Sequence, residues 1–128
     1  MKISSQELGR RGEKLAADFL SKQGYSILAR NVHTPYGELD LVAEQRDTSN
    51  PAENLIVFVE VKSRRSQSFG YPEDSITANK REHLISAAQH FLQEHPGLGD
   101  DWRIDVIAIE IYKNRAPIIN HFENAIHE

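Results

Sequence analysis

The chain has 128 residues, of which 39% are hydrophobic and 27% are charged, and this predicts one globular domain spanning residues 1–128. The formal net charge of −4 does not by itself indicate a nucleic-acid binder, although a local basic patch remains compatible with it. The absence of cysteine excludes disulfides and thiolate metal sites. No apolar run reaches the roughly 20 residues of a membrane span, and the N-terminus lacks an apolar signal core, so we expect a soluble cytoplasmic protein without membrane contact.

The first predicted element is an amphipathic helix over residues 4–23, whose apolar residues recur at helical spacing. Ser4 with Glu7 three residues later fits a capping box. Gly9 and Gly12 lie inside this helix, where each glycine costs up to ~1 kcal/mol relative to alanine. Two explanations remain open for the pair: close approach of another backbone, or a frayed first turn.

A strand over residues 38–43 carries acids among apolar residues. Because side chains alternate between the two faces of a strand, we expect Glu38 and Asp40 to share one face. By the same rule, Leu39 and Leu41 are expected to share the other face.

The next strand, over residues 55–62, begins as a near-continuous apolar run and ends with a carboxylate and an amine. Alternation places Phe58, Glu60 and Lys62 on one face and the odd-numbered valines on the other. Charged groups at the end of a buried strand are costly unless they are paired or bound to a metal. Antiparallel pairing with the preceding strand would bring the Asp40 face and the Glu60 face together.

The element order predicted for the whole chain is αβββαββ. This order is typical of a mixed β-sheet flanked by helices, in the α/β (α+β) class. The expected strands cover residues 25–31, 38–43, 55–62, 102–111 and 116–119, the helices cover residues 4–23 and 77–95, and residues 121–125 form a tail.

The acids and the lysine at these two strand ends indicate a chemistry. Two carboxylates with nearby backbone carbonyls form a hard-oxygen site suited to Mg²⁺ or Mn²⁺. A lysine beside such a metal can orient and help deprotonate an attacking water. Asp40, Glu60 and Lys62 therefore fit metal-assisted phosphodiester hydrolysis. A second interpretation stays open, in which Lys62 makes an ordinary ion pair with either acid at a solvated strand end.

The spacing of these residues resembles known motifs. Gly37-Glu-x-Asp40 followed by Glu60-x-Lys62 resembles the signature of the PD-(D/E)XK nuclease superfamily, although Glu38-Leu39 stands where that signature has its proline. The wider pattern resembles the YraN-like family of small bacterial proteins, which is related in pattern to archaeal Holliday junction resolvases. The wider pattern comprises Gly9-x-x-Gly12-Glu13, Phe58-Val-Glu-Val-Lys62-x-Arg64, Phe69-Gly-x-Pro72, Lys80-Arg81 and Asn124-Ala125.

The resemblance implies a restriction-endonuclease-like fold and a metal-dependent nuclease that acts on DNA, with branched or junction DNA as a candidate substrate. It implies that Asp40, Glu60 and the backbone carbonyl of Val61 bind the metal. Lys62 would position or activate the water, and Glu13 would approach the same metal from the first helix. A resolvase cuts two strands symmetrically, so this relationship favours a homodimer.

Basic residues near these motifs are candidates for binding the phosphate backbone. Arg64, Lys80 and Arg81 follow the site strand, and Phe69 and Tyr71 are candidates for stacking on bases. A solvated surface is the simpler explanation for any single basic residue, core packing is the simpler one for Phe69, and Lys80 stands out because its position matches the family pattern. Two other functions therefore stay open: a nucleic-acid-binding module without turnover, and a protein-interaction domain.

Overall fold

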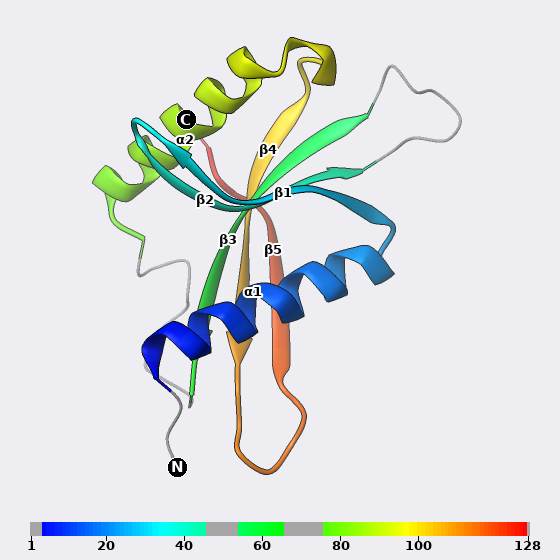
Figure 1. Cartoon of the computed structure of the whole chain (residues 1–128), viewed down its shortest axis with the longest axis vertical. Helices are drawn as coiled ribbons and strands as arrows, with labels where there is room; N and C mark the ends of the chain where they lie inside the picture. The colour runs from blue at the N-terminus through cyan, green and yellow to red at the C-terminus, as the bar shows by residue number, and fades with distance from the viewer. Residues whose placement is uncertain (1–3, 46–53, 66–75, 128) are drawn as a thin grey trace.

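The computed structural model describes residues 4–45, 54–65 and 76–127 of the chain, and the order αβββαββ predicted from the sequence is confirmed. Figure 1 shows these elements coloured along the chain. A short 3₁₀ turn, η3, follows the second helix. The elements are α1 (Ser5–Lys22), β1 (Tyr25–Thr34), β2 (Gly37–Gln45), β3 (Leu55–Arg64), α2 (Ala78–Glu94), η3 (Pro96–Leu98), β4 (Trp102–Glu110) and β5 (Ile118–Ile126).

The strands form one mixed sheet in the order β1-β2-β3-β4-β5. Every neighbouring pair is antiparallel except β3 and β4, which run parallel and are connected through α2. Parallel neighbours need such a crossover connection. The antiparallel pairing of β2 with β3, on which the predicted site depends, is confirmed. Within the described ranges, no helix has the length and apolar composition needed to cross a membrane.

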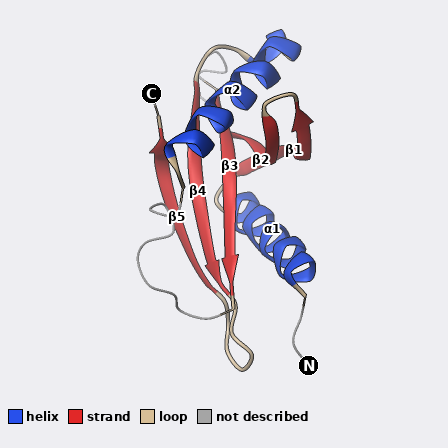
Figure 2. Ribbon diagram, turned by 90° about the vertical axis from the view of Figure 1, so that its left-hand side faces the viewer, coloured by secondary structure: helices blue, strands red, loops and turns tan. Residues whose placement is uncertain are grey.

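The two helices cover opposite faces of the sheet (Figures 1 and 2). On the α2 face, Phe58 packs with Leu84 and Phe91. On the α1 face, the odd-numbered valines of β3 pack with Ala16 and Leu20. Burial on both faces explains why β3 reads as a nearly continuous apolar run, and it confirms the predicted alternation along that strand.

Gly12 lets α1 pack closely on β3. A Cβ atom at Gly12 would lie 2.9 Å from the Cβ of Ser63 and would overlap the Ser63 hydroxyl, so close approach is the correct explanation for this glycine. A Cβ atom at Gly9 would meet nothing within 4 Å. Of the two explanations left open for the pair, close packing therefore does not apply to Gly9. The predicted cap is present, because Ser4 Oγ accepts a hydrogen bond of 3.1 Å from the Glu7 N–H.

The predicted alternation along β2 is wrong at one point. Leu39 packs in the cluster on the α2 face together with Val42, whereas Leu41 packs on the α1 face. The reason is a local irregularity in the β1–β2 pair, where residues 31 and 40 stand opposite each other without being paired. Asn31 has a φ of 51°, in the left-handed region, so the backbone opposite Asp40 departs from regular strand geometry.

The predicted tail over residues 121–125 is part of β5, which is longer than the expected strand over residues 116–119. Residues of this polar segment form hydrogen bonds with the fully buried Asp105 of β4. His121 Nε2 lies 2.7 Å from Asp105 Oδ2, and the Asn124 N–H donates to Asp105 Oδ1 at 2.8 Å. The polar residues that suggest a tail in the sequence are therefore the hydrogen-bond partners of one buried acid.

Candidate functional site

Glu60 lies near the middle of β3, where the side chains change from buried to half-buried. Its side chain is 7% exposed, and its Oε1 atom is 3.8 Å from Lys62 Nζ and 3.8 Å from Lys80 Nζ. Lys80 comes from the first turn of α2, which Thr77 fixes by accepting a hydrogen bond from the Lys80 N–H at 3.1 Å. The start of α2 thus brings a second ammonium group to the carboxylate that was predicted to pair with Lys62.

Asp40 lies where β2 and β3 separate. The backbone register of the two strands ends at Leu41 and Val59. Beyond that point, the Val61 N–H donates to Asp40 Oδ2 at 2.9 Å, so a side chain replaces a backbone acceptor. In a strand that pairs antiparallel, the N–H and C=O of one residue point toward the same neighbouring strand. The Val61 carbonyl is therefore directed toward the edge that carries Asp40.

The carboxyl groups of Asp40 and Glu60 are neighbours, and each influences the ionisation of the other. Burial, together with the neighbouring Asp40, raises the pKa of Glu60 to about 7, although the Lys80 and Lys62 ammonium groups act in the opposite direction. Burial also raises the pKa of Asp40. Two neighbouring carboxylates, one buried and one half-buried, are costly when both are charged, and a bound cation would reduce that cost.

The oxygen atoms gathered here suit a hard divalent cation that keeps some of its waters. They suit less well a metal that is held by protein ligands alone. Within the described part of the chain, no group of three or more His, Asp or Glu side chains is arranged to hold a metal ion. Asp40 and Glu60 would supply two carboxylates to such a cation, and the Val61 carbonyl, directed toward the same edge, would supply a third oxygen. Mg²⁺ typically takes one or two carboxylates and completes its coordination with water and phosphate oxygens.

Glu13 reaches the site from α1, directly after the closely packed Gly12. Its burial and the nearby Asp40 raise the pKa of Glu13. With the amide nitrogen of Asn31 turned toward the acids, Nδ2 lies 3.0 Å from Glu13 Oε2 and 3.2 Å from Glu38 Oε1. Sequence reasoning missed Asn31. Its one local signal is that asparagine tolerates the left-handed conformation better than other residues with a side chain.

The structure thus brings together Glu13, Asp40, Glu60, Lys62 and Lys80, from α1, β2, β3 and α2. The other predicted phosphate-binding residues are nearby in the chain. Arg64 is the last residue of β3, and Arg81 follows Lys80 in the first turn of α2, both half-buried. Phe69 and Tyr71 lie outside the described residues.

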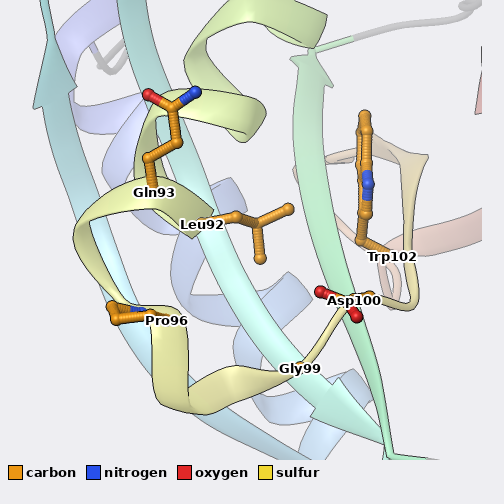
Figure 3. Close-up of a pocket in the computed structure, with 6 residues that line it drawn as sticks. All are labelled: Leu92, Gln93, Pro96, Gly99, Asp100 and Trp102. Atoms are coloured by element: carbon orange, nitrogen blue, oxygen red, sulfur yellow. The ribbon is translucent and has the colours of Figure 1, made fainter.

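A cavity of about 290 Å³ lies at the other end of α2 (Figure 3). It is separated from Lys80 by most of the length of the helix, about 18 Å at 1.5 Å per residue. The cavity is therefore distinct from the acid cluster. It is lined by Leu92, Gln93, Pro96, Gly99, Asp100 and Trp102.

A solved structure aligns with most of this chain. It is the structure of the EndoMS-dsDNA2 complex, with a TM-score of 0.46 and 19% sequence identity. The alignment covers 89% of this chain and 40% of that chain.

Sequence comparison identifies the family. The model of the "Uncharacterised protein family UPF0102" matches residues 12–109. A UPF0102 protein of Syntrophomonas wolfei is 46% identical over 121 residues, which cover 94% of this chain and 98% of that protein. A UPF0102 protein of Dehalococcoides mccartyi is 33% identical over 128 residues, which cover 100% of this chain and 99% of that protein. The chain therefore belongs to the UPF0102 (YraN) family, which confirms the resemblance seen in its motifs.

Proposed function

We propose that this protein is a nuclease that hydrolyses DNA phosphodiester bonds with a divalent metal ion. The observation that carries the proposal is the half-buried Asp40 beside the buried Glu60, with two ammonium groups 3.8 Å from Glu60 Oε1. This pair lies at a strand edge, beside a backbone carbonyl. An arrangement of this kind supports a site for a cation and a phosphate better than a simple ion pair, because one ion pair would need only one acid and one lysine.

In this proposal, Asp40, Glu60 and the Val61 carbonyl hold Mg²⁺ or Mn²⁺. The cation, when bound, would neutralise the scissile phosphate and polarise its P–O bonds. Lys62, whose Nζ lies 3.8 Å from Glu60, orients the attacking water and stabilises the charge that develops on the phosphate. Glu13 accepts a hydrogen bond from water on the side of Asp40.

The substrate-binding part of the proposal rests on the cations around the acids. Lys80 contacts Glu60 and is 44% exposed, so its ammonium group is accessible to a phosphate oxygen. Arg64 and Arg81 extend the basic surface along the backbone of a bound strand. We further propose branched DNA as the substrate and a homodimer as the active form, since two symmetric cuts require two sites.

The test is cleavage of end-labelled duplex, single-stranded, flap and four-way-junction DNA in Mg²⁺, Mn²⁺ or EDTA. Glu60→Gln removes one carboxylate charge and keeps the shape of the side chain. Glu82→Gln is the matched control, because Glu82 is an exposed glutamate on α2. The expected result is cleavage that needs the metal, falls on the order of 100-fold or more in Glu60→Gln and is retained in Glu82→Gln.

Equal cleavage by wild type and Glu60→Gln would overturn the site assignment. Salt-dependent DNA binding with no cleavage in any metal would replace the nuclease by a binding module. No DNA binding even at low salt would remove nucleic acid as the ligand. The panel therefore separates the three functions that the sequence leaves open, and the substrate that is cut fastest tests the preference for branched DNA.

A further inference from the structure

Asn31 combines two features that no role in the proposed function explains: an unusual backbone conformation and a side-chain amide beside two acids. It lies in the middle of β1, where regular strand dihedrals are expected, yet its φ is 51°. Among the described residues other than glycine, only Asn31 and Asn124 have a positive φ. Residues held in this region cost free energy and tend to persist where a site needs them.

The backbone of Asn31 affects the strand that carries Asp40. Residue 31 stands opposite residue 40, between the pairs Arg30–Leu41 and Val32–Leu39, and this rung is the unpaired one. Both strands lose their alternation here. Ala29 and Val32 of β1 pack on the α2 face, and so do Leu39 and Val42 of β2. This irregular rung releases Asp40 from the β1–β2 ladder, so that its carboxylate can accept the Val61 N–H.

The side chain of Asn31 connects three elements. With its amide nitrogen turned toward the acids, Nδ2 lies 3.0 Å from Glu13 of α1 and 3.2 Å from Glu38 of β2, while its backbone belongs to β1. A primary amide carries two N–H donors, which is the minimum needed to hold two carboxylates at once. Aspartate at the same position would offer only acceptors, and glycine would offer no side-chain donor.

We propose that Asn31 is the positioning residue of the acid cluster, with its left-handed backbone aiming Asp40 and its amide holding Glu13 and Glu38 in place. This inference rests on the proposed nuclease function for its catalytic consequence but not for its geometry. Asn31 is exposed, so its replacement removes little packing. Variants at this position are therefore expected to fold.

The geometry is tested by NMR without any DNA. The side-chain amide signals of Asn31 are assigned in ¹⁵N-labelled wild type and followed in Glu13→Gln and Glu38→Gln. Asp18→Asn is the matched control, since Asp18 is an exposed acid on α1. Both glutamine variants are expected to shift the Asn31 amide signals, and the control is expected to leave them unchanged. Amide signals that stay in place in both glutamine variants would overturn the proposal.

The catalytic consequence is tested with two variants that tolerate the same backbone. Asn31→Gly keeps the left-handed φ and deletes the amide, and Asn31→Asp keeps the shape and replaces donors by acceptors. Both are expected to lower kcat about 10- to 100-fold while the KM for DNA stays unchanged, the usual effect of losing a group that orients a metal-site residue. Asn124→Gly is the matched control, because Asn124 is also exposed and has a φ of 50°.

The outcomes separate the two proposals. A wild type that cleaves no DNA would defeat the nuclease proposal, and the NMR comparison alone would then decide the role of Asn31. A wild type that cleaves DNA, with Asn31→Gly and Asn31→Asp equally active, would defeat the positioning role and leave the nuclease intact. The loss of folding stability and the loss of activity in Asn31→Gly can both be expressed as free energies. If the two are equally large, Asn31 belongs to the fold rather than to the site.

Discussion

At the scale of single residues, ionised Glu60 lowers the stability of the folded protein, because its carboxylate is buried beside another acid. Burial and the neighbouring Asp40 raise its pKa from an ordinary value of 4.5 to about 7. The folded state therefore binds more protons than the unfolded chain between pH 4.5 and pH 7. Stability falls as the pH rises through that window, because the unfolded carboxylate loses its proton first. A site that is costly when empty and charged is one that gains from binding a cation.

Replacing Glu60 by glutamine removes this cost. In EDTA at pH 8, Glu60→Gln is expected to raise the free energy of unfolding by about 2 kcal/mol relative to wild type. The gain is expected to shrink toward zero as the pH falls below about 4.5, where Glu60 is protonated in both states. Urea unfolding at several pH values measures the difference. A gain of the same size at pH 4.5 and pH 8 would contradict the raised pKa.

At the scale of elements, the close contact between α1 and β3 depends on the glycine at position 12, which has no side chain. Gly12→Ala would push a methyl group into Ser63 on β3 and is expected to cost about 1 to 3 kcal/mol of stability, the usual cost of overpacking. Because Glu13 follows Gly12, the same change is expected to displace that acid. Gly9→Ala is the control, and it is expected to stabilise the helix by about 0.5 to 1 kcal/mol, since its Cβ meets open space.

Thermal unfolding of both alanine variants measures this contrast. Ser63→Gly removes the group that the new methyl would meet, so it should recover part of the loss in a double variant with Gly12→Ala. Equal effects of Gly12→Ala and Gly9→Ala would show that the helix does not pack on Ser63 as closely as described.

The pairing of β4 with β5 depends on Asp105, which is fully buried. Burial alone would raise its pKa, but hydrogen bonds from His121, Asn124 and Arg103 hold the pKa of Asp105 below its ordinary value. Its charge therefore contributes stability above about pH 4, and this contribution is lost as the pH falls below that value.

Asp105→Asn is expected to lower the free energy of unfolding by about 3 kcal/mol at pH 7, because Arg103 and the β5 donors lose a buried charged partner. Glu123→Gln is the matched control. Glu123 contacts the same Arg103 at 3.7 Å but is 62% exposed, so its loss should cost less than about 1 kcal/mol. Chemical denaturation at pH 7 compares the two variants, and equal losses would argue against the buried network.

At the scale of the whole molecule, local patterns were enough to predict the order of elements. The run from Leu55 to Val61 has the signature of a strand buried on both faces, and the alternation of Glu60 and Lys62 followed from it. What failed depends on distant partners. Residues 121–125 look like a tail until Asp105 is placed beside them, and the left-handed Asn31 cannot be inferred from a rule that assumes regular strands.

The role of the metal can be judged from the stability of the whole fold, independently of cleavage. A ligand that binds only the folded state raises stability by RT ln(1 + [L]/Kd), about 2.7 kcal/mol at a hundredfold excess over Kd. Mn²⁺ or Mg²⁺ is therefore expected to raise the melting temperature of wild type relative to EDTA. The increase should be larger at pH 8 than at pH 6, because the proton held by the Asp40–Glu60 pair competes with the cation.

Removing either carboxylate should abolish this increase, whereas the surrounding fold should persist. Asp40→Asn and Glu60→Gln are expected to melt at the same temperature with metal and with EDTA, and Glu82→Gln is expected to respond like wild type. Differential scanning calorimetry measures all four proteins. A metal-induced increase that survives in Glu60→Gln would move the cation away from this pair. No increase in wild type would leave Asp40 and Glu60 as a proton-sharing pair held by two lysines, and the nuclease proposal would lose its metal.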